Sequence, residues 1–211
     1  MREHRLSVTR SARYYTLGEP GEGVREVWFV LHGYAQLAAR FLRHFEPLDD
    51  GTRLIVAPEG LSRFYLTENP TERRVGATWM TKEDRLAEIA DYVRYLDTVY
   101  DDVLRAMDRA RIKVTVLGFS QGSATACRWT TLGASRFERL IVWGGEIPPD
   151  VDLLPSLRLS LVYGSRDEYF PPKVVAATEA RLREHRIPYD LAPFDGGHEI
   201  NGGVLQKVAG S

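Results

Sequence analysis

The chain has little cysteine and no long apolar run. Cys127 is its single cysteine among 211 residues, so no disulfide can form within the chain. No window approaches the roughly 20 apolar residues of a transmembrane helix, and the amino terminus lacks the apolar segment of a signal peptide. We therefore expect no membrane span and a cytoplasmic location.

Strong charge of either sign and recognisable metal ligands are also missing. The formal net charge of −1 gives no argument for nucleic acid or an anionic membrane as a partner. There is no H-E-x-x-H motif, no pair of cysteines and no Walker-type phosphate loop. The sequence thus predicts neither a metal nor a cofactor. Its length and ordinary composition predict one α/β domain over residues 1–211.

Apolar runs alternate with helical patterns along the chain. This alternation is typical of a mostly parallel sheet with helices on both faces. The first strand should be an antiparallel edge strand, and several inner strands are almost wholly apolar, as strands covered on both faces are. The expected strands are Arg13–Leu17, Glu26–Leu31, Thr52–Ala57, Lys113–Gly118, Arg139–Trp143, Leu159–Gly164 and Tyr189–Phe194.

Helical spacing of apolar residues predicts the helices between these strands. Thr81 is the expected N-cap of the longest helix, with Asp84 three residues on as in a capping box. The expected helices are Leu37–Phe45, Lys82 to about Met107, a helix from about Ser123, Pro172 to about His185, and a short helix after Asn201.

The motif Gly118-Phe119-Ser120-Gln121-Gly122 carries the clearest chemical signal. It lies between an expected strand and an expected helix, which is the context that a nucleophile elbow requires. The tight turn puts the serine at a strained backbone position, and the flanking glycines avoid collisions with neighbouring elements. We predict Ser120 as a nucleophile; the alternative is a chance match in a chain with 18 glycines.

A serine hydroxyl becomes a strong nucleophile only when a base takes its proton. In enzymes with this elbow, a carboxylate and then a histidine follow the serine along the chain. His185 and His198 are the histidines after Ser120. His185 lies in a charged run that reads as a solvated helix end. His198 follows the last expected strand in a glycine-rich loop, so it is the predicted base, with a surface-loop histidine as the alternative.

The acid should follow a strand end between the serine and the histidine. Asp167 lies three residues beyond the last glycine of Leu159–Gly164. Its carboxylate could accept a hydrogen bond from the imidazole and set its tautomer. Glu168 is the rival, and Asp195 a weaker one.

An oxyanion hole needs two backbone N–H groups. The residue after the nucleophile, Gln121, would supply one of them. The second should come from the loop after an early strand, and Leu31-His32-Gly33 has that form. The N–H of Tyr34 is the predicted second donor, and His32 is expected to be structural.

The segment from Glu59 to Met80 does not fit the alternation. A long irregular stretch in a compact domain is often a functional loop, and this one follows the carboxyl end of a strand, where ligands bind in α/β sheets. We favour a substrate pocket over a surface loop that covers the core. The predicted substrate-binding residues are the apolar ones in strand-end loops: Phe64, Tyr65, Trp79, Met80, Ile147 and Phe170.

With these motifs in view, the chain resembles the phospholipase/carboxylesterase family of α/β-hydrolases, which includes acyl-protein thioesterases, lysophospholipases and small bacterial carboxylesterases. The resemblance covers nearly the whole chain and implies an α/β-hydrolase fold with no large cap domain. It also implies that Ser120, Asp167 and His198 form a triad and that Gln121 and Tyr34 supply the oxyanion N–H groups. The motifs that carry it are Leu31-His32-Gly33, Ala57-Pro58, Trp79-Met80, Gly118-Phe119-Ser120-Gln121-Gly122, Gly144-Gly145, Gly164-Ser165-Arg166-Asp167 and Gly197-His198-Glu199.

The function that these residues predict is a cofactor-free serine hydrolase of small acyl esters or thioesters. A peptide- or amide-directed hydrolase on the same fold is one alternative. A non-catalytic binding protein is another, although such proteins normally lose a triad member. The sequence leaves the oligomeric state open between monomer and homodimer.

Overall fold

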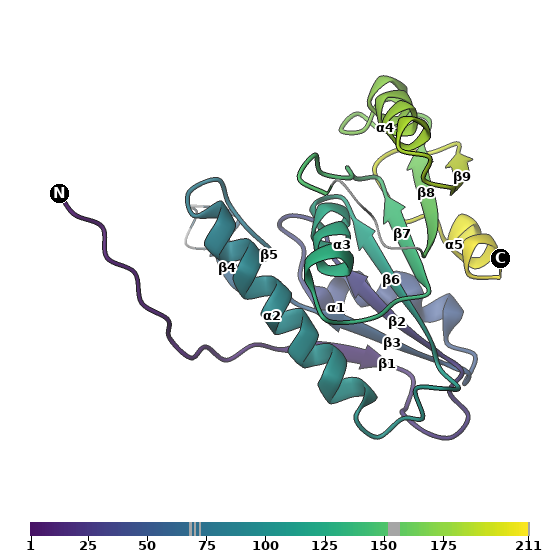
Figure 1. Ribbon diagram of the computed structural model, residues 1–211, viewed down its shortest axis with the longest axis horizontal. Helices are drawn as coiled ribbons and strands as arrows, with labels where there is room; N and C mark the ends of the chain where they lie inside the picture. The colour runs from purple at the N-terminus through teal and green to yellow at the C-terminus, as the bar shows by residue number, and fades with distance from the viewer. Residues whose placement is uncertain (68, 70, 72, 152–156, 211) are drawn as a thin grey trace.

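The computed structural model describes residues 1–67, 69, 71, 73–151 and 157–210. Within them, the main sheet has the strand order β1-β3-β2-β6-β7-β8-β9 (Figure 1). The first strand, β1, pairs antiparallel with β3, and the other pairs are parallel. The mostly parallel sheet and its antiparallel edge strand are therefore confirmed. The strands are β1 (Tyr14–Leu17), β2 (Glu26–Leu31), β3 (Arg53–Pro58), β6 (Lys113–Phe119), β7 (Arg139–Trp143), β8 (Arg158–Gly164) and β9 (Tyr189–Phe194).

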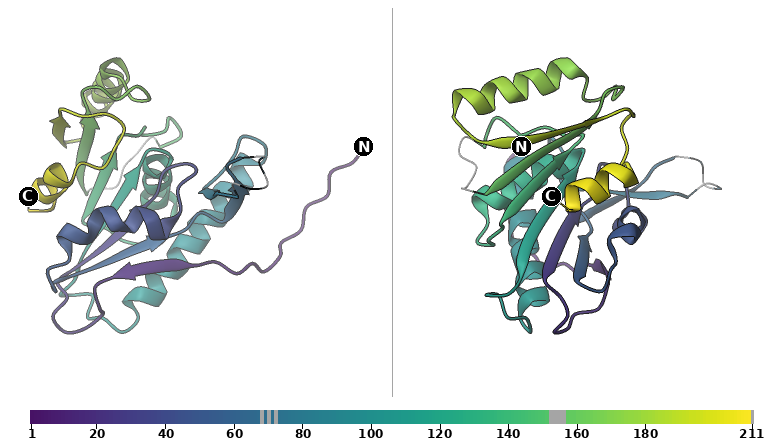
Figure 2. Two further views of the ribbon diagram at one scale, coloured as in Figure 1. Left: turned by 180° about the vertical axis from the view of Figure 1, so that it is seen from behind. Right: turned by 90° about the vertical axis from the view of Figure 1, so that its right-hand side faces the viewer.

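Helices cover both faces of this sheet (Figure 2). On one face α2, α3 and α4 pack against strand side chains such as Phe29, Val116 and Leu161. On the other face α1, the 3₁₀ helix η1 and α5 enclose Trp28 and Trp143. The inner strands are buried on both sides, which explains their almost continuous apolar sequences. The helices are α1 (Ala38–Phe41), η1 (Leu42–Leu48), α2 (Arg85–Leu104), α3 (Gln121–Leu132), α4 (Pro172–Glu184) and α5 (Gly202–Ala209).

Two expected helices need correction. The long helix spans Arg85–Leu104 rather than Lys82 to about Met107, and its N-cap is Asp84 instead of Thr81. Thr81 lies ahead of the helix, where its backbone N–H and its hydroxyl donate to the carboxylate of Glu88. The expected helix Leu37–Phe45 is α-helical only over Ala38–Phe41 and continues as η1, which contains Pro47.

The segment expected to be irregular contains an antiparallel hairpin. Its strands are β4 (Ser62–Tyr65) and β5 (Val75–Thr78), with Ser62 opposite Thr78. Positions 68, 70 and 72 of this segment lie outside the described residues. The hairpin joins the carboxyl end of β3 to the long helix α2. In the part of the chain that is described, no helix is both long and apolar enough to cross a membrane.

Candidate active site

Ser120 occupies the sharp turn between β6 and α3. Its backbone has φ 54° and ψ −119°, a region that non-glycine residues seldom adopt. A Cβ on Gly118 would come within 2.2 Å of the Gly122 carbonyl oxygen, and one on Gly122 within 2.2 Å of the Leu31 carbonyl oxygen. Both glycines of the motif are therefore required by close backbone contacts. The backbone N–H of Ser120 donates to the Trp143 carbonyl at 3.0 Å, which fixes the turn against β7.

A second serine, Ser123, supports the turn, although its sequence context predicted no role for it. Ser123 is fully buried, and its hydroxyl donates to the Gly118 carbonyl at 2.7 Å. A Cβ on Gly145 would come within 2.2 Å of the Ser123 oxygen and 2.6 Å of the Ser120 carbonyl oxygen. The only signal in the sequence is that small residues follow the motif where a packed helix usually carries larger ones.

Asp167 and His198 form a hydrogen-bonded pair. The imidazole Nδ1 lies 2.8 Å from Oδ2 of the carboxylate. The other oxygen, Oδ1, accepts from the backbone N–H groups of Tyr169 and Phe170, each at 2.9 Å. Since an ionised carboxylate only accepts, this network places an imidazole proton on Nδ1, so that Nε2 is the acceptor whenever the ring is neutral. The Asp167 side chain is 1% exposed and that of His198 19%, so the pair is sheltered at the carboxylate and open at the imidazole.

The rival residues form no hydrogen bond with His198 within the described part of the chain. Glu168 is exposed, and Asp195 forms an exposed ion pair with Arg166. His185 is exposed at the end of α4, as its charged surroundings predicted.

Gly144 and Gly145 lie between Ser120 and the Asp167–His198 pair. Gly144 has φ 49°, and a Cβ on it would be 3.3 Å from both Asp167 Oδ2 and His198 Nδ1. Its neighbour Gly145 lies against Ser120, and the ring of Phe119 is 4.8 Å from the His198 ring between centroids. Because these two glycines have no side chains, Ser120 and the Asp167–His198 pair can approach each other closely across this turn.

The loop after β2 lies directly beside the serine. A Cβ on Gly33 would be 3.1 Å from Ser120 Cβ, and the Gly33 N–H donates to the Gln36 side chain at 2.8 Å. No hydrogen bond within the described residues engages the Tyr34 N–H. The N–H of Gln121 is in the first turn of α3, where backbone donors have no partner in the helix. The role of the Tyr34 and Gln121 N–H groups as oxyanion donors stays a prediction, with no hydrogen bond to the Tyr34 N–H among the described residues standing against it.

His32 has a structural part in this loop. Its Nδ1 lies 2.8 Å from the Gly33 carbonyl, and its Nε2 accepts from the Gly60 N–H at 2.9 Å. Burial lowers the pKa of the imidazole, so the ring is neutral and serves as one donor and one acceptor.

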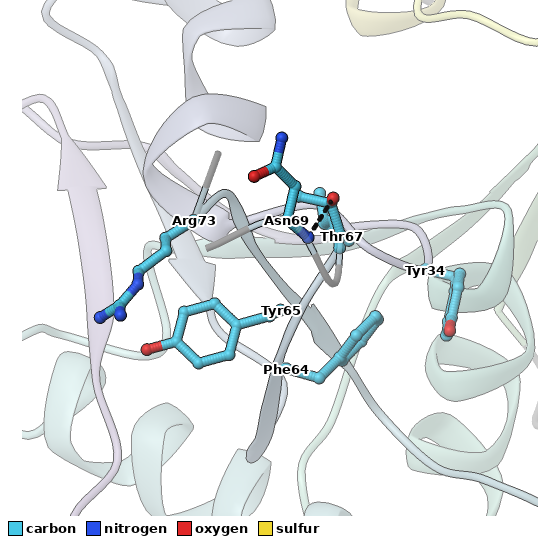
Figure 3. A pocket seen from close by; sticks show the side chains of 7 residues that line it. Tyr34, Phe64, Tyr65, Thr67, Asn69 and Arg73 are labelled. Carbon is cyan, nitrogen blue, oxygen red and sulfur yellow. Dashed lines mark hydrogen bonds between the residues drawn. The ribbon is translucent and has the colours of Figure 1, made fainter. Parts of the chain in front are cut away.

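A cavity of about 940 Å³ adjoins the same loop (Figure 3). Tyr34 belongs to its wall, and the Tyr34 ring stacks on that of Phe64 with centroids 5.2 Å apart. Two of the predicted substrate-binding residues, Phe64 and Tyr65, line it. The cavity residues that sequence reasoning missed are Leu66, Thr67, Asn69 and Arg73.

The other predicted substrate-binding residues lie elsewhere. Trp79 is 2% exposed in the core, where its indole N–H donates to the His32 carbonyl at 2.8 Å. Ile147 is also 2% exposed and packs in the core. Met80 is half-buried, and its carbonyl accepts from the Gln121 side chain at 3.0 Å. Phe170 stacks on His198 with ring centroids 6.1 Å apart, so it adjoins the imidazole rather than the large cavity.

Solved structures match this fold over nearly its whole length. Esterase PE8 has a TM-score of 0.72 at 19% identity, covering 95% of this chain and 97% of that one. Acyl-protein thioesterase 2 from Zea mays has a TM-score of 0.71 at 15% identity, covering 95% and 97%. A Bacillus cereus carboxylesterase has a TM-score of 0.70 at 14% identity, covering 93% and 91%. The chain has the α/β-hydrolase fold. The resemblance predicted from the motifs is thereby confirmed at the level of the fold. No protein-family model matches the chain, and no curated protein matches it in sequence.

The α/β-hydrolase fold explains why residues distant in sequence meet here. Parallel strands end at one edge of the sheet, and ligands bind beyond those carboxyl ends. Ser120 follows β6, Asp167 follows β8 and His198 follows β9. The described segments between strands include no large cap domain, and the β4–β5 hairpin lies at this edge instead. In the same part of the chain, no His, Cys, Asp and Glu side chains group as metal ligands.

Proposed function

We propose that the protein is a serine hydrolase that cleaves small carboxylic esters or thioesters through an acyl-enzyme on Ser120, and that residues 1–211 act as one domain. The observation that carries this proposal is the buried Asp167–His198 pair next to a serine in a strained elbow. A structural hydrogen bond would require neither the strained backbone at Ser120 nor the glycines that let the two parts approach. That strain favours an enzyme over a binding protein.

The reaction would proceed in two halves. The Ser120 oxygen attacks the carbonyl carbon while His198 Nε2 takes its proton. The carbonyl oxygen becomes an oxyanion and accepts hydrogen bonds from the Gln121 and Tyr34 N–H groups. The bond to the leaving alcohol or thiol then breaks, and that group receives the proton from His198. Water adds to the acyl-enzyme in the same way, and Ser120 regains its proton as the carboxylic acid leaves.

Asp167 would hold the imidazole in the required tautomer and stabilise the imidazolium that forms. Its two backbone N–H bonds keep the carboxylate oriented toward Nδ1. The cavity walled by Tyr34, Phe64 and Tyr65 would receive the bulkier group of the ester, since it begins at the loop that carries the Tyr34 donor. Its aromatic wall suits a flat group, which stacks favourably on exposed rings.

Turnover of p-nitrophenyl esters and acyl-CoA thioesters by the Ser120→Ala variant tests this function. We expect kcat to fall by roughly 10⁴-fold or more, as deletions of a catalytic serine do. Ser165→Ala is the control, because Ser165 is an exposed serine two residues before Asp167 and has no assigned role. Equal turnover by Ser120→Ala and the wild type would refute the proposal.

A further inference from the structure

Glu59 is a buried carboxylate that the proposed reaction does not use. It directly follows β3 at the carboxyl edge of the sheet, and its side chain is 2% exposed. A buried carboxylate without partners is strongly disfavoured, so its contacts define a specific local arrangement. Those contacts lead to the loop beside Ser120 and to the hairpin that walls the cavity.

Three separate segments bind the Glu59 side chain. Its Oε1 accepts from Arg13 Nε at 2.7 Å and from Arg63 Nη1 at 3.3 Å. Its Oε2 accepts from the backbone N–H of Ala38 at 3.3 Å. Arg13 immediately precedes β1, Arg63 is in β4 of the hairpin, and Ala38 is the first residue of α1. One carboxylate thus joins the sheet edge, the hairpin and the helix after the oxyanion loop.

Glu59 and its neighbour hold both ends of that loop. The loop runs between His32 and Ala38, and it carries the Tyr34 N–H. At its far end Ala38 donates to Glu59, and at its near end the Gly60 N–H donates to His32 Nε2 at 2.9 Å. The path of the loop beside Ser120 therefore depends on where the Glu59-Gly60 segment lies.

The same carboxylate contacts a strand that walls the cavity. Successive side chains of a strand point to opposite sides, so Arg63 can turn to Glu59 while Phe64 turns to the Tyr34 ring. The loop and the hairpin also meet directly, because the Ala35 N–H donates to the Ala77 carbonyl at 2.9 Å. The pair of Glu59 with Arg63 therefore links the carboxyl end of β3 to the strand that carries Phe64.

We propose that Glu59 is a positioning residue, which holds the oxyanion loop and the β4–β5 hairpin in one arrangement relative to Ser120. It acts through Ala38 and Arg63 and does not touch the reacting atoms. Its effect on catalysis rests on the proposed function. Glu59→Gln keeps the volume and one amide oxygen but removes the charge that two arginines share. A displacement of about 1 Å in a reacting group can cost about 100-fold in rate.

The test compares Glu59→Gln with Glu26→Gln in the full chain. Glu26 is the control, because its carboxylate also pairs with an arginine, Arg53, at 2.8 Å. Glu26 is the first residue of β2 and therefore lies at the other end of that strand from the site. Two quantities are measured well below the unfolding temperature: amide hydrogen exchange in residues 33–41 and 62–66, and kcat and KM for a p-nitrophenyl ester. For Glu59→Gln we expect exchange at least about tenfold faster in both segments, and a kcat about 10- to 100-fold lower with KM changed less than about threefold.

The outcomes separate this proposal from the proposed function. Unchanged exchange in both segments would overturn the positioning role, whatever the activity. Faster exchange with an unchanged kcat would overturn the catalytic part of it. A wild type that hydrolyses no ester would refute the proposed function, while the exchange data would still test Glu59. Should Glu59→Gln fail to fold, Arg63→Gln takes its place, since it leaves Glu59 paired with Arg13. Its hydrogen exchange is then measured in residues 62–66, where the same increase is expected and unchanged exchange would overturn the positioning role.

Discussion

Replacing Asp167 by asparagine tests the role of the buried carboxylate with little change in shape. In the wild type, Oδ1 accepts two backbone N–H groups and Oδ2 faces the imidazole Nδ1 at 2.8 Å. The asparagine oxygen must keep the two backbone donors, because an NH₂ group there would face two N–H groups. Its NH₂ group then points at Nδ1 of His198. The imidazole can accept that donor only by moving its proton to Nε2, which is the atom that must take the serine proton.

The expected loss follows from that tautomer. A comparable change in a serine protease triad lowers kcat by about 10⁴-fold, equivalent to about 5.4 kcal/mol of transition-state stabilisation. The assay is kcat for p-nitrophenyl acetate, with thermal unfolding as a check on folding. Glu168→Gln is the matched control, because Glu168 is the exposed neighbour, and it should change kcat by less than about tenfold. A crippled Glu168→Gln beside an active Asp167→Asn would refute the assignment of the acid.

Three further predictions concern the cavity and the fold. Phe64→Leu should lower kcat/KM by roughly threefold to tenfold for aryl esters and much less for small alkyl esters, because an aromatic pair contributes about 0.5–1.5 kcal/mol; an equal loss for both would exclude Phe64 from binding. Hydrogen bonds from Arg128 lower the pKa of Asp150 from 3.8 to about 2, so its stabilising effect is present above about pH 4 and lost as the pH falls toward 2. Asp150→Asn should therefore lower the unfolding temperature at pH 7 and have little effect near pH 2, and a constant difference across that range would contradict the ion pair. Burial raises the pKa of the Cys127 thiol to about 12, so a thiol reagent at pH 8 should modify it only in unfolded protein; rapid modification of the native protein would contradict its burial.

The sequence predicts the elbow well because its constraints are local. Gly118 and Gly122 occur where a Cβ would overlap backbone atoms, so the motif carries its own geometric requirement. The order of strands and helices is equally legible, since fully buried parallel strands need continuous apolar runs. The chain-order rule then singles out Asp167 and His198, which the structure brings within hydrogen-bond distance.

Side-chain direction after a strand end cannot be predicted in the same way. Trp79 and Phe64 are both aromatic residues in one segment, but Trp79 packs in the core, where the His32 carbonyl accepts its indole N–H, whereas Phe64 lines the cavity. The hairpin itself escapes prediction because each of its strands has four residues without clear alternation. Glu59 depends on partners 4, 21 and 46 residues away, and only tertiary structure brings them together.

Covalent labelling by a fluorophosphonate probe tests the central claim most directly, because the probe reacts with a serine only when a base and an oxyanion hole activate it. The intact mass of the native wild type should rise by one adduct, and peptide mapping should place that adduct on Ser120. Ser120→Ala should remain unlabelled under the same conditions, and heat-unfolded wild type should not react. A folded wild type that gains no adduct, or a Ser120→Ala variant that gains the same one, would contradict the account.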